Sequence, residues 1–224
     1  ARKRQRLISD LPTSKTTGVF VGLNEIKGQT RSAAPLTSYL AETACVYYRY
    51  TIEERWSRWE TETYTDSNGD RKTRRVHKSG WSTVEQQEEM QAFELEDDHG
   101  RIRILPSGAN IEPEKIYHQR CGKGNPLYYG KGPARSIMDS DGIRQFTEYA
   151  IPLNDTLYIL GDARERSDMV AAEIASSKHA PYFLISTRSE ETIVSGKAAK
   201  FWGLSLLGAV PPGATLGFIQ SQGG

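Results

Sequence analysis

The feature that most constrains the fold is an alternation of apolar and polar side chains over residues 44–55. Val46, Tyr48, Tyr50 and Ile52 fall on one face of an extended chain there. A two-residue period of this kind is typical of a strand that is buried on one side. Similar runs predict further strands at residues 18–26, 145–153, 156–161 and 182–186. We therefore predict a mainly β, barrel-like domain with α+β character at its margins.

Two turn signals predict β-hairpins. Residues 67–70 read Ser-Asn-Gly-Asp between two polar runs, and Asn-Gly favours a tight turn. Both arms are polar on both faces, so we expect the hairpin at residues 60–80 to project into solvent. The second signal, Asp-His-Gly at residues 98–100, separates an apolar pattern at residues 93–95 from another at residues 102–104.

Helix is a minor part of the expected fold. Residues 167–176 favour two or three turns, and a capping box at Thr187 predicts a C-terminal helix from about Ser189 toward Lys200. Closely spaced glycines and prolines predict a loop over residues 117–133.

A long uncharged run lies near the C-terminus, at residues 201–219. Its length is enough to span a bilayer as a helix, and Trp202 suits an interface anchor. The alternative is an apolar tail packed on the domain, because Pro211-Pro212 and four glycines weaken a helix in water. The first interpretation makes residues 189–220 a helix with a transmembrane segment.

The same interpretation gives a basic juxtamembrane segment at residues 1–6 and a β domain at residues 7–188. Four cations at the amino end, and Lys197 with Lys200 before the uncharged run, both adjoin this domain. Positive charge concentrates on the cytoplasmic side of membranes. We therefore expect the lipid bilayer as one partner, with the domain on the cytoplasmic face of a prokaryotic-type membrane.

Composition excludes several classes of protein. The 29 Lys and Arg against 28 Asp and Glu give a net charge of +1, which argues against a protein built mainly to bind nucleic acid. The two cysteines, Cys45 and Cys121, are too few for a zinc finger, a RING site or a disulfide framework. Unpaired cysteines also agree with a reducing compartment.

No motif supplies a catalytic, cofactor-binding or metal-binding residue. The glycines at 124, 130 and 132 lack the spacing and the hydroxyl of a phosphate-binding loop. Asp66, Asn68 and Asp70 imitate a calcium loop, but a hairpin turn explains them more simply. We expect the residues at 97–99 to stabilise a turn rather than to form an acid–base site.

His118 and Cys121 lie three residues apart, which leaves a metal pair or a thiol with its base as an alternative. A catalytic cysteine needs an oriented partner, however, and two ligands do not make a structural metal site. We therefore interpret the two residues as a loop histidine and an ordinary thiol.

Aromatic and basic residues surround the predicted hairpin. Trp56, Trp59 and Trp81 are expected to cover the core, with an interface as the alternative. We expect ion pairs across the hairpin, rather than a nucleic-acid contact. The cations concerned are Arg71, Lys72, Arg74 and Arg75, and the acids are Glu54, Glu60 and Glu62.

Several segments together resemble the GIDE domain family in their order and spacing, from about residue 7 to residue 219. The segments that carry the resemblance are residues 17–22, 35–36, 45–50, 93–100, 148–155, 158–161 and 181–191, with Trp59 and Trp81. In the MULAN-type E3 ubiquitin ligases of this family, the domain lies between two transmembrane helices and a RING finger follows. The resemblance implies that residues 201–219 are the second of those helices.

This sequence departs from the ligases because it has no RING cysteines, so the resemblance does not extend to ubiquitin transfer by the chain itself. We expect a non-catalytic domain that binds a protein or lipid partner beside the membrane. Two alternatives remain. One is a component of a ubiquitin-ligase-like system. The other is a single-stranded nucleic-acid binder, since small β-barrels often serve that purpose.

Overall fold

The computed structural model describes residues 13–168, 171–178 and 182–188. Within these ranges the chain forms thirteen strands and one five-residue helix, which confirms the mainly β prediction. No helix among the described residues is long and apolar enough to cross a membrane. The expected C-terminal helix and the uncharged run lie outside the described residues.

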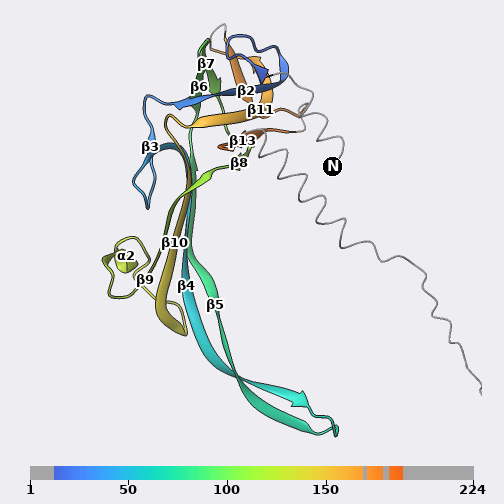
Figure 1. Ribbon diagram of the computed structural model, residues 1–224, viewed down its shortest axis with the longest axis vertical. Helices are drawn as coiled ribbons and strands as arrows, with labels where there is room; N and C mark the ends of the chain where they lie inside the picture. Colours follow the sequence, from blue (N-terminus) through green and yellow to red (C-terminus); the bar gives the residue numbers. More distant parts are fainter. Residues whose placement is uncertain (1–12, 169–170, 179–181, 189–224) are drawn as a thin grey trace, which may run out of the picture. The chain divides into compact units, whose positions relative to one another are not determined.

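Five strands close into a barrel (Figure 1), as the sequence predicted. Each strand pairs with the next around a ring, and β11 returns to pair with β2. In ring order the strands are β2 (Gly22–Arg31), β6 (Phe93–Asp97), β7 (Gly100–Ile104), β12 (Ala172–Ala175) and β11 (Thr156–Glu165). Three short strands extend this sheet, namely β1 (Thr13–Ser14), β8 (Asn110–Glu112) and β13 (Leu184–Ser186).

The barrel has the connectivity of an OB-fold. Along the chain, its first strand pairs with the second and the fourth, and its third strand, β7, pairs in parallel with its fifth, β12. This is the Greek-key arrangement of that five-stranded fold. Apolar side chains from the barrel strands fill its interior. They include Ile26, Leu95, Ile102, Ile104, Leu157, Ile159 and Ile174, all 3% exposed or less.

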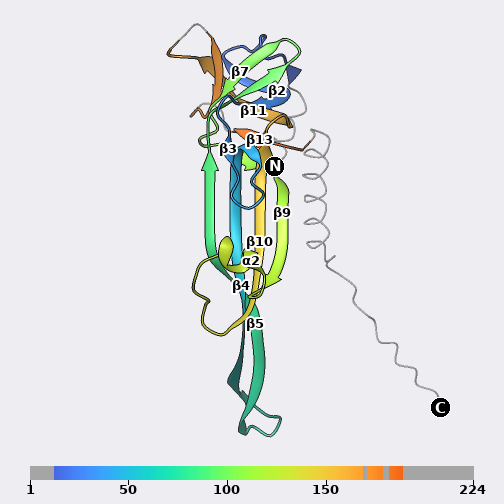
Figure 2. The ribbon, with the colours of Figure 1, turned by 90° about the vertical axis from the view of Figure 1, so that its left-hand side faces the viewer.

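Two long insertions in the barrel build a second sheet. The first, between β2 and β6, contributes β3 (Leu36–Thr37), β4 (Ala44–Thr65) and β5 (Arg71–Met90). The second, between β7 and β11, contributes β9 (Glu114–Gly122), the helix α2 (Pro126–Gly130) and β10 (Ser140–Pro152). Figure 2 shows β5, β4, β10 and β9 side by side, in the order of their pairing.

One face of the second sheet is covered and forms a core of its own. Tyr48, Tyr50 and Ile52 point into it from β4, as the alternation predicted, and the ring of Tyr39 stacks on Tyr50 at 4.5 Å. Val46 instead joins the barrel core. Phe146 and Ala150 of β10 and Tyr128 of α2 complete the covered side. The alternation therefore serves two cores rather than one.

Several local predictions need correction. Residues 167–176 were expected to be helical, but β12 occupies Ala172–Ala175, because Ile174 packs in the barrel and the strand pairs with β11. The loop expected at residues 117–133 begins later, since β9 runs to Gly122, and it contains the helix α2. The hairpins at residues 67–70 and 98–100 are confirmed, whereas the strand expected at residues 18–26 spans Gly22–Arg31.

Candidate functional site

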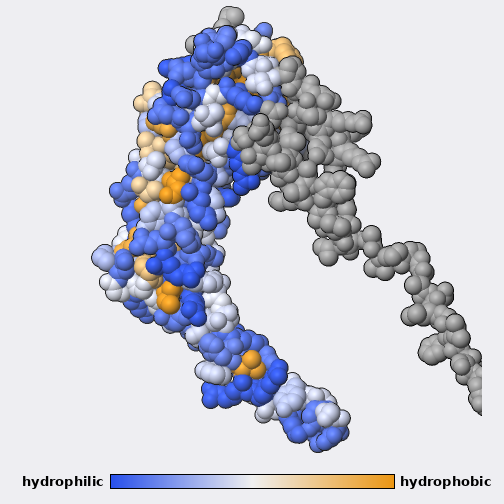
Figure 3. Space-filling view, viewed as in Figure 1, coloured by the Kyte–Doolittle hydropathy of each residue, from blue (hydrophilic) through white to orange (hydrophobic). Residues whose placement is uncertain are grey.

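The β4–β5 hairpin continues beyond the other strands of its sheet. β10 ends opposite Trp56, whereas β4 and β5 remain paired as far as Thr65 and Arg71. We call the two-stranded part, residues 57–79, the ribbon. Most of its side chains are exposed, and Figure 3 shows its surface as largely hydrophilic. The expected projection of this hairpin into solvent agrees with these exposures.

The turn at the tip of the ribbon uses the residues that imitate a calcium loop. Asp66 Oδ1 accepts hydrogen bonds from the backbone N–H groups of Asn68 and Asp70, both at 3.0 Å. Gly69 has a φ of 87°, a conformation that favours glycine. A hairpin turn therefore accounts for all of these residues, as predicted.

The two faces of the ribbon carry different charges, because residues directly opposite each other on antiparallel strands lie on the same face. One face, the ion-paired face, consists of Arg58, Glu60, Glu62, Tyr64, Lys72, Arg74, Val76 and Lys78. Lys78 Nζ lies 2.8 Å from Glu60 and 2.9 Å from Glu62. Its hydrogen bonds are the largest cause of the lowered pKa of both carboxyl groups. Arg74 also pairs with Glu62, at 3.4 Å.

The opposite face contains no carboxylate. This acid-free face consists of Trp59, Thr61, Thr63, Thr65, Arg71, Thr73, Arg75 and His77. The ring of Trp59 is 62% exposed, with the guanidinium of Arg75 at 5.4 Å and the ring of His77 at 5.1 Å. Among the described residues, Arg71 and Arg75 form no ion pair. The expectation that Trp59 covers the core is therefore wrong, and ion pairing does not extend to all four predicted cations.

We call residues 123–139, which connect β9 to β10 and contain α2, the α2 segment. On the face of the second sheet that this segment covers, the same strand β4 carries a fully buried charge. Glu54 and Arg144 are both 0% exposed and are joined by two hydrogen bonds of 2.9 and 3.1 Å. Burial works to raise the pKa of Glu54, but the hydrogen bonds that it accepts outweigh burial and lower the pKa. Glu54 therefore does not belong to the ribbon's ion pairs, where the sequence placed it.

Arg144 holds the α2 segment against the sheet. Its guanidinium donates to the backbone carbonyls of Tyr128, Pro133 and Arg135, at 2.6, 2.8 and 3.0 Å. Gly132 lies so close that an added Cβ would stand 2.6 Å from the Arg144 guanidinium. This glycine therefore serves packing, and the segment is a structural cover for the buried ion pair.

His118 and Cys121 do not meet. They stand three residues apart on β9, so their side chains leave opposite faces of the strand. His118 is exposed, with Nδ1 3.1 Å from the Thr147 hydroxyl, while Cys121 lies in the second core. Burial raises the pKa of the Cys121 thiol and raises that of Cys45 to about 11. Both thiols are therefore protonated and unreactive at neutral pH.

The Asp-His-Gly turn between β6 and β7 is held by Asp97. Its carboxylate accepts four hydrogen bonds, from the hydroxyl and N–H of Thr16 and from the N–H groups of His99 and Gly100. Burial raises the pKa of Asp97, but these bonds prevail and lower it to about 2. Asp97, Asp98 and His99 place three ligand atoms within 4.8 Å of one another, yet the oxygens of Asp97 are occupied by turn bonds. The prediction that these residues stabilise a turn is confirmed.

OB-folds bind oligonucleotides and oligosaccharides on their second and third strands and on adjoining loops. Here those strands, β6 and β7, carry acids and cations that pair with each other. Arg101 lies 2.7 Å from Glu96 and 3.3 Å from Glu94. Glu96 also pairs with Arg31, at 2.5 Å. This surface therefore offers a polyanion no net positive charge.

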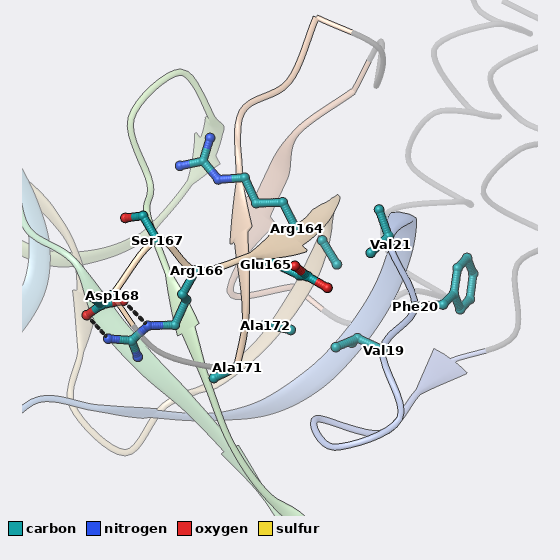
Figure 4. Close-up of a pocket in the computed structure, with 11 residues that line it drawn as sticks. Val19, Phe20, Val21, Arg164, Glu165, Arg166, Ser167, Asp168, Ala171 and Ala172 are labelled. Carbon is teal, nitrogen blue, oxygen red and sulfur yellow. Dashed lines mark hydrogen bonds and ion pairs between the residues drawn. The ribbon is translucent and has the colours of Figure 1, made fainter.

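A hollow of about 580 Å³ lies beside the end of β11 (Figure 4). Exposed apolar side chains, Phe20 and Val21, line it from the segment just before β2. On the other side Arg166 and Asp168 hold each other through two hydrogen bonds, at 2.8 and 2.6 Å. Of the charged side chains that line the hollow, only Glu165 forms no ion pair among the described residues.

The model of the GIDE family, described as E3 ubiquitin ligase, matches residues 61–210, about two-thirds of the chain. Neither the curated proteins nor the solved structures include a match to this chain. The family match spans most of the ribbon and both strands that close the barrel, β11 and β12.

Proposed function

The chain belongs to the GIDE family, and from this premise we propose that it is a non-catalytic interaction domain that binds a protein partner beside a membrane. Its resemblance to membrane-flanked domains and the uncharged run at residues 201–219 support the membrane location. The cations on both flanks favour the cytoplasmic face.

The ribbon is the observation that carries this proposal. Ordering a residue's backbone costs about 1–2 kcal/mol, and globular proteins offset this cost mainly by burying apolar surface. The ribbon buries almost none, since every side chain of its acid-free face is exposed. A long ordered element with no core of its own is expected where the element serves contact with another molecule.

A role within a ubiquitin-ligase-like system is the second candidate, favoured by the description of the family. The two cysteines of this chain are buried in its second core and cannot provide the zinc ligands of a RING. In that system the chain would therefore hold a partner rather than assist transfer itself. Nucleic-acid binding on the barrel is disfavoured because its β6–β7 surface is neutralised by its own ion pairs.

Cross-linking of the full-length protein in its native membranes, followed by identification of the captured proteins, tests the proposal. We expect a specific partner whose recovered amount rises with the amount of the cross-linked full-length protein. Turnover of a substrate by the purified protein, abolished by His118→Ala or Cys121→Ala, would instead make the chain an enzyme and overturn the proposal.

A further inference from the structure

In the ribbon, the charged side chains of β5 are all positive. From residue 71 to residue 84, β5 contains five Lys or Arg and no Asp or Glu. The acids that neutralise the ion-paired face all come from β4 and the turn, as in the pairs Arg74–Glu62 and Lys78–Glu60. Any molecule that approaches β5 from its outer side therefore meets a cationic strand.

The outer edge of this strand is also unpaired. Among the described residues β5 pairs with β4 alone, so its second row of backbone N–H and C=O groups is open to a further strand. Charged side chains normally protect such an edge from association. A second copy of β5 would be repelled by like charge, whereas an acidic strand would be attracted.

We propose that the outer edge of β5, over residues 71–79, binds an extended acidic peptide segment of a protein partner as an added strand. The backbone of the segment pairs with β5, and its alternate carboxylates lie beside Arg71 and Arg75 on the acid-free face. This inference rests on the proposed function, in which the partner is a protein, and identifies the chemistry of that partner.

A peptide fits this surface better than a nucleic acid or a lipid headgroup. Only a peptide can pair with the open backbone groups of an edge strand. Single-stranded nucleic acids need free aromatic faces for stacking, and Trp59, the one tryptophan that is exposed among the described residues, already contacts Arg75 and His77. Two arginines without acids also form a narrow site, suited to one strand rather than to a membrane surface.

The test measures binding of a labelled peptide of about ten residues, with alternating Glu and Thr, to the full-length protein in detergent. Alternation places every carboxylate on one face of the added strand. One control peptide is methylated at every backbone amide, which retains the charge but removes all of its backbone hydrogen-bond donors. A second control peptide has Lys in place of Glu. We expect the acidic peptide to bind at least about tenfold more tightly than either control.

Two variants locate the site. Arg71→Gln with Arg75→Gln should weaken binding by about tenfold or more, whereas Lys123→Gln with Arg135→Gln, an equal loss of charge at exposed positions in the α2 segment, should leave it within about twofold. The peptide should also slow hydrogen exchange of the β5 amides. Thermal unfolding of both variants shows whether they fold like the wild type.

Equal affinity for the methylated peptide, or no effect of the Arg71 and Arg75 substitutions, would overturn strand addition. So would anionic vesicles or an oligonucleotide that bind through these arginines while the acidic peptide does not. A partner that is still cross-linked by the doubly substituted protein would leave the proposed function intact and remove only this inference. Failure to capture any partner would count against the proposed function itself.

Discussion

Two acids that stand six positions apart on one strand differ in their surroundings. Glu54 of β4 is fully buried and joined to Arg144, whereas Glu60 lies on the ribbon and pairs with Lys78 in solvent. Both belong to the same face of the sheet. What differs is the cover, because the α2 segment lies over the first acid and nothing described lies over the second. The comparison shows that charge on this sheet forms a buried structural pair where it is covered and a solvent-exposed pair where it is not.

Breaking the buried pair tests the first half of this comparison and has the largest expected effect. Arg144→Met leaves Glu54 buried without its cation, so the free energy of unfolding should fall by about 3–5 kcal/mol. Urea denaturation measures this change. The double variant Glu54→Leu with Arg144→Met should recover only part of the loss, since it removes both charges but leaves the carbonyls that Arg144 bonds without a donor. A loss below about 1 kcal/mol in the single variant would show that water reaches the pair.

The cover itself is tested by Gly132→Ala. The added methyl group would stand 2.5 Å from the Tyr128 carbonyl oxygen and 2.6 Å from Arg144, so either the segment or the arginine must shift. We expect a loss of about 1–3 kcal/mol in the free energy of unfolding, as for other overpacked sites. Gly124→Ala is the matched control, since no atom lies within 4 Å of its added methyl group. Equal losses in both variants would contradict this account.

Asp97 extends the comparison to the barrel, because its carboxylate is held by hydrogen bonds rather than by a cation. Its folded pKa of about 2 lies below the unfolded value, so its contribution to stability is present above about pH 4 and is lost as the pH falls toward 2. The contribution is about 2 kcal/mol at most, since solvent screens part of it. Between pH 6 and pH 2 the free energy of unfolding should therefore decrease less for Asp97→Asn than for the wild type. An unchanged slope would contradict the assignment.

The smallest effect is expected at the exposed end of the comparison. Lys78→Gln removes two ion pairs on the ribbon, but both are screened by solvent, so the unfolding midpoint should not change measurably. A clear loss of stability in thermal denaturation would show that the ribbon is held by its charges, and the distinction between covered and uncovered charge would then fail.

Local patterns predicted much of this molecule. The alternation at Tyr48, Tyr50 and Ile52 located a buried face, and Asn68-Gly69 located the ribbon's turn. Pairing residues one by one outward from that turn also assigns them to the two faces of the ribbon. Glu62 falls opposite Arg74 on one face, and Trp59 falls opposite His77 on the other. The sequence interpretation summed the charges of both faces together, and so it missed the acid-free face.

Other features depend on contacts between distant residues and had no local signal. The Glu54–Arg144 pair joins residues ninety positions apart, and nothing near either residue indicates burial. The strand β12 was mistaken for a helix because four residues are too few to show a period, and its pairing with β7 and β11 decides its conformation. Tertiary pairing overrides local preference at such places.

The insertions that build the second sheet also set the order in which the chain can assemble. β2 can complete its pairing only after β11 has been synthesised, since Gly28 of β2 pairs with Leu157 of β11. The ring closes only when β12 has also been synthesised. The hairpin of β4 and β5, by contrast, joins neighbours in sequence and can form as soon as both have left the ribosome. A nascent chain would thus form the ribbon well before the barrel that carries it exists.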